Sequence, residues 1–515
     1  MHYFINLVDI VPMPIINSIL SWIMKQRIHQ IELFIKYPSE VQEDLFRKLI
    51  LAGRFTEWGN KYHYSSIKTV QDYRERVPVQ NYESLKPYIN RIRQGEQRLL
   101  WSSDVKWFAK SSGTTSDKSK FIPVTTESLE DCHFKGGKDL LSLYCNNHPD
   151  TGLFNGKLLS LGGSHQVNSF DNDSIYGDLS AILIQNLPFW IQIFRTPDIS
   201  IALMDEWEAK IEQIARSTMK EDVTNISGVP SWTLVLLNRI LEITGKKDIT
   251  EVWPNLELFI HGAVNFKPYA DQFRKLIPKQ GMRYYETYNA SEGFFGIQDR
   301  FGSDEMLLML DYGIFYEFIP LDQIGLDNPK ALTLDQVRLN ENYAIVITTN
   351  AGLWRYMIGD TVIFTDLSPY RIKITGRTAH FINAFGEEII VDNAESAISR
   401  ACLKTGAVIR EYTAAPIYYS GNACGAHEWL IEFEQLPVDL SEFGQVLDQE
   451  LKNVNSDYEA KRYKDMVLRP PVIRNLPAGT FYKWLKAKEK LGGQHKVPRL
   501  SNDRKIIEEV LVVVN

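Results

Sequence analysis

One kind of segment recurs between residue 1 and about residue 370 and constrains the fold more than any other feature. It is a short apolar, β-branched run that ends in a small or polar turn, as at 157–163, 256–263, 282–293 and 343–352. Helical patterns lie between these runs, and strands that alternate with helices predict an α/β fold. Because ligand sites in open α/β sheets lie at the carboxyl ends of strands, we expect the chemistry of the chain in these turns.

The pattern changes after a strand-like run at 371–377, where smaller units of strands and helices follow. At 428–434 large apolar residues alternate with glutamates, which predicts an antiparallel strand with one buried face and the glutamates on the other. Helices are expected around 440–451 and 479–491, packed on this small sheet. The sequence therefore predicts a large first domain of β-sheets flanked by helices and a smaller α+β second domain.

Length and composition fit a folded protein of more than one domain. The chain has 515 residues, of which 44% are hydrophobic and 23% are charged. A formal net charge of -7 argues against the broad basic surface that nucleic acid requires, so no nucleic-acid partner is expected. The four cysteines form no CxxC pair and no metal-like cluster with histidine, which indicates reduced thiols and a cytoplasmic protein.

The apolar stretch at residues 4–24 raises the question of a signal peptide. It contains Asp9, Pro12 and Pro14 and lacks a basic start, so a docking helix from about Ile15 is favoured instead. No other segment is long and apolar enough to span a bilayer, and no membrane partner is expected. The apolar face of the helix, which continues toward Phe34, would comprise Ile16, Ile19, Leu20, Ile23 and Ile31.

The segment KSSGTTSDKSK at 110–120 is a polar loop between two predicted strands, as in a hairpin. Its hydroxyl groups and glycine backbone can wrap a polyphosphate, and Lys118 and Lys120 supply compensating charge. No second glycine precedes a Lys-Ser or Lys-Thr pair at the Walker A spacing, which argues against a P-loop kinase. A Ser/Thr/Gly stretch alone can also be an ordinary solvated turn. The phosphate-binding residues would be Ser111, Ser112, Gly113, Thr114, Thr115, Ser116 and Lys120.

Three later segments make this loop more specific, because all four occur in the order found in adenylate-forming enzymes. YNASE at 288–292 is similar to the Tyr-Gly-x-Thr-Glu motif of the superfamily of acyl-CoA synthetases, peptide-synthetase adenylation domains and luciferases. LWRYMIGD at 353–360 resembles its Tyr-x-x-Gly-Asp motif. The segment that begins ITGRTAH at Ile374 resembles the hinge that opens a mobile C-terminal domain.

Within this superfamily the chain most resembles the auxin- and jasmonate-conjugating acyl-acid amido synthetases, the Gretchen Hagen auxin-responsive family, in its bacterial form. The loop SSGTTSDKSK, the segment GLWRYMIGD and the ending GQHKVPR at 493–499 carry this resemblance. Asn289 and Met357 depart from residues common in relatives, so local contacts there can differ. The resemblance implies an ATP- and acyl-acid-binding domain over 1–375 and a mobile C-terminal domain over 376–515.

The resemblance also assigns roles to single residues, each with a simpler structural alternative. Glu292 would bind Mg²⁺, which prefers carboxylate and phosphate oxygens, although it could instead be a charge at a helix N-terminus. Asp360 would accept both ribose hydroxyls, or be a simple turn aspartate. Lys496 would reach the reacting carboxylate and the α-phosphate. Further nucleotide contacts, or else core packing and hinge bracing, would come from Gly262, Ala263, Tyr288 and Arg377.

The expected reaction joins a small-molecule carboxylic acid to an amine, such as an amino acid, with ATP and Mg²⁺ as cofactors and AMP and pyrophosphate as products. A carboxylate must attack the α-phosphate, so the protein has to position the reactants and stabilise charge rather than supply covalent chemistry. Two alternatives remain open at this point. One is an acyl-CoA ligase, which shares the first half-reaction, and the other is a non-catalytic nucleotide-binding regulatory protein.

Overall fold

The largest element of the fold, in this computed structural model, is a mixed sheet of eleven strands. Across the sheet the strands are β12 Ile314–Pro320, β13 Asn342–Thr349, β14 Tyr356–Leu367, β15 Tyr370–Arg377, β11 Met306–Leu308, β10 Gly293–Ile297, β9 Arg283–Ala290, β8 Leu258–Gly262, β7 Val223–Ser227, β3 Lys157–Ser160 and β6 Arg195–Thr196. From β9 to β6 neighbouring strands are parallel, and from β9 to β12 they are antiparallel. The carboxyl ends of β3, β6, β7, β8 and β9 therefore share one edge.

The structure describes residues 13–111, 120–162, 168–169, 174–204, 206–263, 266, 269–324, 326, 329–377, 381–382, 387, 389–418, 425–455, 458–459, 462, 468–488, 496–501 and 503–514. The four strand-and-turn runs predicted from the sequence correspond to β3, β8, β9 and β13. The predicted phosphate-loop residues Ser112, Gly113, Thr114, Thr115 and Ser116 lie outside the described residues.

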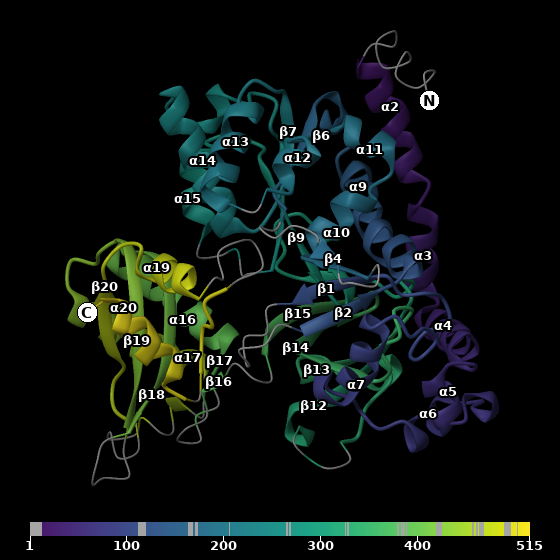
Figure 1. Ribbon diagram of the computed structural model, residues 1–515. Coiled ribbons are helices and arrows are strands. Elements are labelled where there is room, and N and C mark those ends of the chain that lie inside the picture. The colour runs from purple at the N-terminus through teal and green to yellow at the C-terminus, as the bar shows by residue number, and fades with distance from the viewer. Residues whose placement is uncertain are drawn as a thin grey trace.

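Helices cover both faces of the parallel part of the large sheet (Figure 1). One face packs on α13, α14 and α15 through residues such as Ile226 and Phe259, and the other packs on α9 through Tyr144 and Leu258. This layering explains the near-continuous apolar runs of these strands, because both of their faces are buried. The helices of this part are α2 Met13–Lys25, α3 Ile28–Lys36, α4 Pro38–Gly53, α5 Glu57–Lys61, α6 Val70–Arg76, α7 Tyr82–Arg93, α8 Thr126–Ser128, α9 Lys135–Asn147, α10 Leu179–Asn186, α11 Phe189–Ile193, α12 Ile199–Ala202, α13 Trp207–Thr218, α14 Pro230–Thr244 and α15 Ala270–Leu276.

A second, four-stranded sheet contributes to the largest hydrophobic core. In it β1 Trp107–Ser111 pairs antiparallel with β2 Lys120–Val124, so the two strands predicted on either side of the polar loop form a hairpin ladder. The other strands of this sheet are β4 Asn168–Ser169 and β5 Ile175–Gly177.

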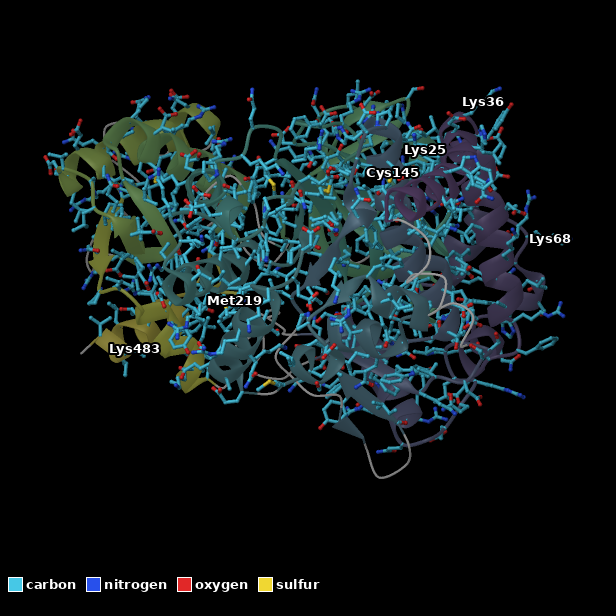
Figure 2. The ribbon with its side chains drawn as sticks, turned by 90° about the horizontal axis from the view of Figure 1, so that it is seen from above. Lys25, Lys36, Lys68, Cys145, Met219 and Lys483 are labelled. Carbon is cyan, nitrogen blue, oxygen red and sulfur yellow. The ribbon has the colours of Figure 1, made fainter. Side chains whose placement is uncertain are left out.

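The predicted N-terminal docking helix is present, but the prediction that it has a single apolar face is wrong. The chain forms two helices, α2 and α3, with Arg27 between them. Ile31 is buried on α3, whereas Ile19 and Ile23 on α2 are 50% and 40% exposed. The helix α2 has no continuous apolar stripe and is held by its contact with α9. Figure 2 shows Lys25 of α2 beside Cys145 of α9. The buried Arg27 side chain anchors the junction through ion pairs with Asp139 and Asp311 at 2.9 and 2.6 Å.

The C-terminal part lies to one side of the larger body (Figure 1). It is built on a three-stranded sheet in which β19 Gly425–Gln435 is central, between β18 Val408–Tyr418 and β20 Val472–Leu476. Two helices, α16 Val391–Thr405 and α17 Leu440–Val454, pack on one face. The other face is covered by α19 Thr480–Ala487 and α20 Lys505–Val514. The α/β fold with a large sheet domain and a smaller C-terminal domain, as predicted, is confirmed.

Because helices cover both faces, the prediction of an exposed glutamate face on β19 is wrong for Glu432. Its side chain is only 2% exposed, and its carboxylate accepts hydrogen bonds from the backbone N–H groups of Gly479 and Phe481 at 2.6 and 3.2 Å. Buried carboxylates are tolerated when such donors satisfy them. Among the described residues, no helix has the length and apolar character needed to cross a membrane.

Candidate active site

One cavity of about 2040 Å³ lies at the carboxyl ends of β8 and β9 and reaches the C-terminal part. Both parts of the chain contribute to its wall, which is the arrangement that the motifs imply. The predicted site residues that line it are Gly262, Ala263, Tyr288, Glu292, Asp360 and Lys496. Segments far apart in the sequence therefore meet around one space large enough for a nucleotide and a second substrate.

Tyr288 and Asp360 form a buried, hydrogen-bonded pair in this wall. The Tyr288 hydroxyl donates a hydrogen bond of 2.8 Å to Oδ2 of Asp360, and the two side chains are 5% and 8% exposed. Asp360 follows Gly359, whose φ of +88° is a conformation that glycine adopts without strain. The hydrogen bond holds one oxygen of the carboxylate at the cavity wall, where the group can accept hydrogen bonds from a ligand.

At the end of β8, backbone atoms rather than long side chains line the cavity. A Cβ atom on Gly262 would lie 2.5 Å from the carbonyl oxygen of Thr287, so the strand pair has no room for a side chain there. Ala263 has a φ of +71°, and its carbonyl oxygen accepts a hydrogen bond from Nζ of Lys496. Next to them, His261 is buried and stacks on Phe266, and burial lowers the pKa of His261 to about 3. His261 is therefore neutral at physiological pH.

Glu292 lies in the two-residue turn between β9 and β10, where its half-buried side chain lines the cavity. It is not at a helix N-terminus, which removes that alternative for its role. Within the described ranges, no group of three or more His, Cys, Asp and Glu side chains could hold a metal by itself. A hard cation here would need additional oxygens from a phosphate or from water, and Mg²⁺ commonly binds in this way. The carboxylate therefore fits a nucleotide-bound magnesium ion.

Lys496 comes from the C-terminal part, in the segment 496–501, and its side chain is exposed. Three residues later, Arg499 forms ion pairs with Glu395 and Glu411 and donates a hydrogen bond of 3.3 Å to the hydroxyl of Tyr269, which precedes α15. Burial raises the pKa of Glu395, and the positive charge of Arg499 opposes that rise. Sequence reasoning missed this group, although Arg499 belongs to the GQHKVPR motif that drew attention to Lys496.

Not all of the predicted residues converge. Lys120 does not line the large cavity, and its ammonium lies 5.6 Å from the centre of the Tyr82 ring. The backbone of Ser111 ends β1 opposite Lys120. Arg377 ends β15, where its backbone is the neighbour of Asp360. The phosphate-binding role of the loop thus stays a prediction.

Three family models match the chain in succession: the GH3 family N-terminal domain at residues 27–282, the GH3 family central domain at 307–377 and the GH3 family C-terminal domain at 392–505. Among curated proteins, it is 24% identical to the indole-3-acetic acid-amido synthetase GH3.4 of Arabidopsis thaliana, over 91% of this chain and 90% of that one. It is 23% identical to the 4-substituted benzoates-glutamate ligase GH3.12 of the same plant, over 91% and 94% of the two chains.

Solved structures agree on the fold. The GH3.15 acyl acid amido synthetase superposes with a TM-score of 0.79 at 16% identity, covering 95% of this chain and 96% of that chain. A 2-hydroxyisobutyryl-CoA ligase in the postadenylation state, in complex with 2-HIB-AMP, superposes with a TM-score of 0.58 at 12% identity, covering 92% and 91%. Because the GH3 models together account for most of the length, from residue 27 to residue 505, the chain belongs to the GH3 family.

Proposed function

We propose that the protein is an acyl acid amido synthetase, which adenylates a carboxylic acid with ATP and then transfers the acyl group to the amine of an amino acid. The observation that carries this proposal is the meeting of Asp360, Glu292 and Lys496 around one cavity. A ribose acceptor, a magnesium ligand and a mobile cation are the three groups that acid adenylation requires. The activities named for its GH3 relatives support the same reaction.

In this proposal Asp360 accepts hydrogen bonds from the ribose hydroxyls. The hydrogen bond from the Tyr288 hydroxyl holds the Asp360 carboxylate in position. The aromatic face of Tyr288 and the backbone at Gly262 and Ala263 form the wall beside the base. Such a wall selects a flat nucleobase through shape and contact area rather than through charge. Arg377, whose backbone neighbours Asp360, is proposed to contact the ribose or to brace the junction between the two parts.

Glu292 is proposed to hold Mg²⁺ together with phosphate oxygens. When bound, the ion neutralises the charge of the phosphates and makes pyrophosphate a better leaving group. The loop at residues 111–120 is proposed to wrap the β- and γ-phosphates, with Ser111, Lys120 and the residues between them as donors.

Lys496 is proposed to neutralise the charge that develops when the acid carboxylate attacks the α-phosphate. Its ammonium reaches the carbonyl oxygen of Ala263, beside the proposed nucleotide wall. An ammonium held in position before the reaction stabilises such charge without the reorganisation that solvent water would need. The acyl-AMP formed would then wait in the cavity, protected from hydrolysis, for the acceptor amine.

The experiment that tests the function is a screen of carboxylic acids for acid-dependent exchange of pyrophosphate into ATP. Acids that support exchange are then incubated with either amino acids or coenzyme A, and the products are identified by mass spectrometry. Amides are expected. A thioester as the only product would establish the acyl-CoA ligase, and ATP binding without exchange for any acid would favour the regulatory protein.

We further propose a cytoplasmic setting and a bacterial form of the family. Cys132, Cys145 and Cys402 are free thiols in the structure, in keeping with a reducing compartment. The bacterial form rests on the resemblance of the loop and the C-terminal motif alone.

A further inference from the structure

Arg195 is the unusual charge of the large cavity. It lies on the two-residue edge strand β6, its side chain is 6% exposed, and it lines the cavity. Three other described arginines line the same space, and each is neutralised by a carboxylate. Arg27 pairs with Asp139 and Asp311, Arg274 pairs with Asp271, and Arg499 pairs with Glu395 and Glu411. Among the described residues, no carboxylate forms an ion pair with Arg195.

Two nitrogen atoms of the Arg195 guanidinium also lack hydrogen-bond partners among the described residues. These atoms, Nε and Nη1, are buried, and neither atom has a partner in the described part of the chain. Burial lowers the pKa of Arg195, and the charge of Asp198 opposes this effect, yet an arginine stays protonated in proteins. A buried, unpaired cation destabilises a fold. The presence of such a cation in a cavity wall is explained if an anionic ligand binds there and neutralises its charge.

The cavity around Arg195 has a polar side and an apolar side. In the sheet, Leu158 pairs with both Arg195 and Asn225, and Ser160 pairs with Ser227, so these side chains share one face. Asn225, Ser160 and Ser227 all line the cavity. The apolar side of the same space is formed by Leu183, Ile184 and Leu187 of the α10 region and by Leu20 and Ile23 of α2. A ligand with an apolar body and an anionic end fits this arrangement.

Arg195 lies far from the place where the acid is activated. Two strands, β3 and β7, separate β6 from β8, and three strand spacings amount to about 14 Å. Leu258 of β8 is level with Arg195, and Gly262 is four residues further along, which adds about 13 Å in the strand direction. An α-amino acid carries its amine and its carboxylate on the same carbon, so it is too short to join the two places. The acid substrate can be long enough.

We propose that Arg195 binds a second carboxylate of the substrates, distinct from the carboxylate that is activated beside Lys496. The distance assigns this second carboxylate to the far end of the acid rather than to the acceptor amino acid. The protein would then select acids that carry a second acidic group on an apolar body. This inference rests on the proposed function, because it takes the Lys496 end of the cavity as the place of adenylation.

The test compares matched acids in pyrophosphate exchange with the full chain. The pairs are octanoic and octanedioic acid, decanoic and decanedioic acid, and 3-phenylpropanoic acid and its 4-carboxy derivative. For wild type, kcat/KM is expected to favour the diacid of at least one pair by about 10- to 100-fold, the usual strength of a hydrogen-bonded charge pair. In Arg195→Gln this preference is expected to disappear, mainly through KM, while the monoacid changes by less than about threefold.

Arg195→Lys is expected to keep part of the preference, because it retains the charge but not the fork of donors. Arg239→Gln, at an exposed arginine on α14 that does not line the cavity, is the matched control for loss of an arginine. A second arm measures transfer from a preformed monoacyl-AMP to glycine, to glutamate and to propylamine, which has no carboxylate. A loss in Arg195→Gln confined to the two amino acids would assign the bound carboxylate to the acceptor instead.

The inference is overturned if Arg195→Gln leaves the diacid preference unchanged, whatever happens to the amino-acid preference, or if wild type does not prefer the diacid of any pair. Calorimetric titration of the diacids into wild type and Arg195→Gln gives a readout without turnover. If no acid supports exchange but a diacid still binds only to wild type, the proposed function fails while the site stands. If acids are activated but equal binding is seen in both proteins, the site fails while the function stands.

Discussion

The two sides of the cavity are held in place by different kinds of contact. On the side of the large sheet, Tyr288 and Asp360 are buried residues of two strands of one sheet, joined by a hydrogen bond of 2.8 Å. On the C-terminal side, Lys496 is exposed and donates a hydrogen bond to a backbone carbonyl of the large domain, that of Ala263. The side proposed to bind the nucleotide is therefore part of the core, whereas the Lys496 side rests on a surface.

Further hydrogen bonds between the described residues of the two parts also involve polar side chains. The hydroxyl of Tyr482 donates to Glu208 at 2.8 Å, and Gln272 donates to Glu434 at 2.6 Å. Lys483 of α19 and Met219, at the end of α13, are labelled in Figure 2 on the side where the two parts meet. Polar interfaces of this kind within one chain are the ones that open and close. We therefore expect the proposed ribose site to stay fixed while Lys496 moves.

The largest expected effect comes from the fixed side. Glu292→Ala should reduce magnesium-dependent adenylation by at least about 100-fold, because it removes a metal ligand. The fold should survive, since the residue is half-buried in a hairpin turn and contributes little core volume. Acid-dependent pyrophosphate exchange, with a thermal melt as the folding control, checks this. Near-normal exchange in a folded Glu292→Ala protein would remove Glu292 from the site.

Asp360→Ala should come next, with ATP affinity reduced by about 10- to 100-fold, because the ribose hydroxyls lose a charged acceptor. Tyr288→Phe is the matched comparison, since it removes only the hydroxyl that orients Asp360 and should cost less. Isothermal calorimetry with ATP and Mg²⁺ measures both. Unchanged affinity in Asp360→Ala would show that the carboxylate has no role in binding the ribose.

At the contact between the two parts, Tyr269→Phe should slow adenylation by about 2- to 10-fold, because Arg499 loses its hydrogen bond to the large domain. Transfer from preformed acyl-AMP should not change if that step uses another arrangement. Tyr284→Phe is the control, because the Tyr284 hydroxyl has no hydrogen-bond partner among the described residues. Equal slowing of both half-reactions by Tyr269→Phe would contradict a contact specific to one arrangement.

The smallest effect is expected for Glu208→Gln, which weakens the exposed contact with Tyr482 and Lys486. Exposed ion pairs contribute little and are screened by salt, so both half-reactions should change by less than about twofold. Rate measurements at low and high salt check this. A change larger than tenfold would mean that the interface is firmly closed and would remove the contrast between the two sides.

Sequence reasoning predicted the cavity residues whose placement depends on local structure. Gly262, Tyr288 and Asp360 follow from strand-and-turn patterns or short motifs. The neighbouring strands β8 and β9 bring Gly262 and Tyr288 together, whereas Asp360 lies on β14 of the same sheet and meets Tyr288 through a side-chain hydrogen bond. Sequence reasoning was wrong where a residue's environment depends on distant elements. Glu432 is buried because α19 covers the second face of β19, and nothing in the alternating pattern of the strand reports that helix.

Arg195 shows the same limit at the site itself. It follows Phe194 and begins the two-residue strand β6, so no local pattern marks it as part of a cavity wall. Its significance lies in what is absent around it, a carboxylate partner among the described residues, and such an absence is a property of the folded chain. Lys496 was reached only through resemblance, since a single exposed lysine carries no pattern.

The most direct test of the account is to measure the two half-reactions separately in Lys496→Ala. Acyl-AMP formation is followed by rapid quench, and amide formation is followed from acyl-AMP supplied ready-made. Formation is expected to slow by about 100-fold or more, because a group that stabilises transition-state charge is lost, while transfer is expected to change by less than about threefold. Equal losses in both steps, or no loss in formation, would contradict a lysine that approaches for the first step and withdraws for the second.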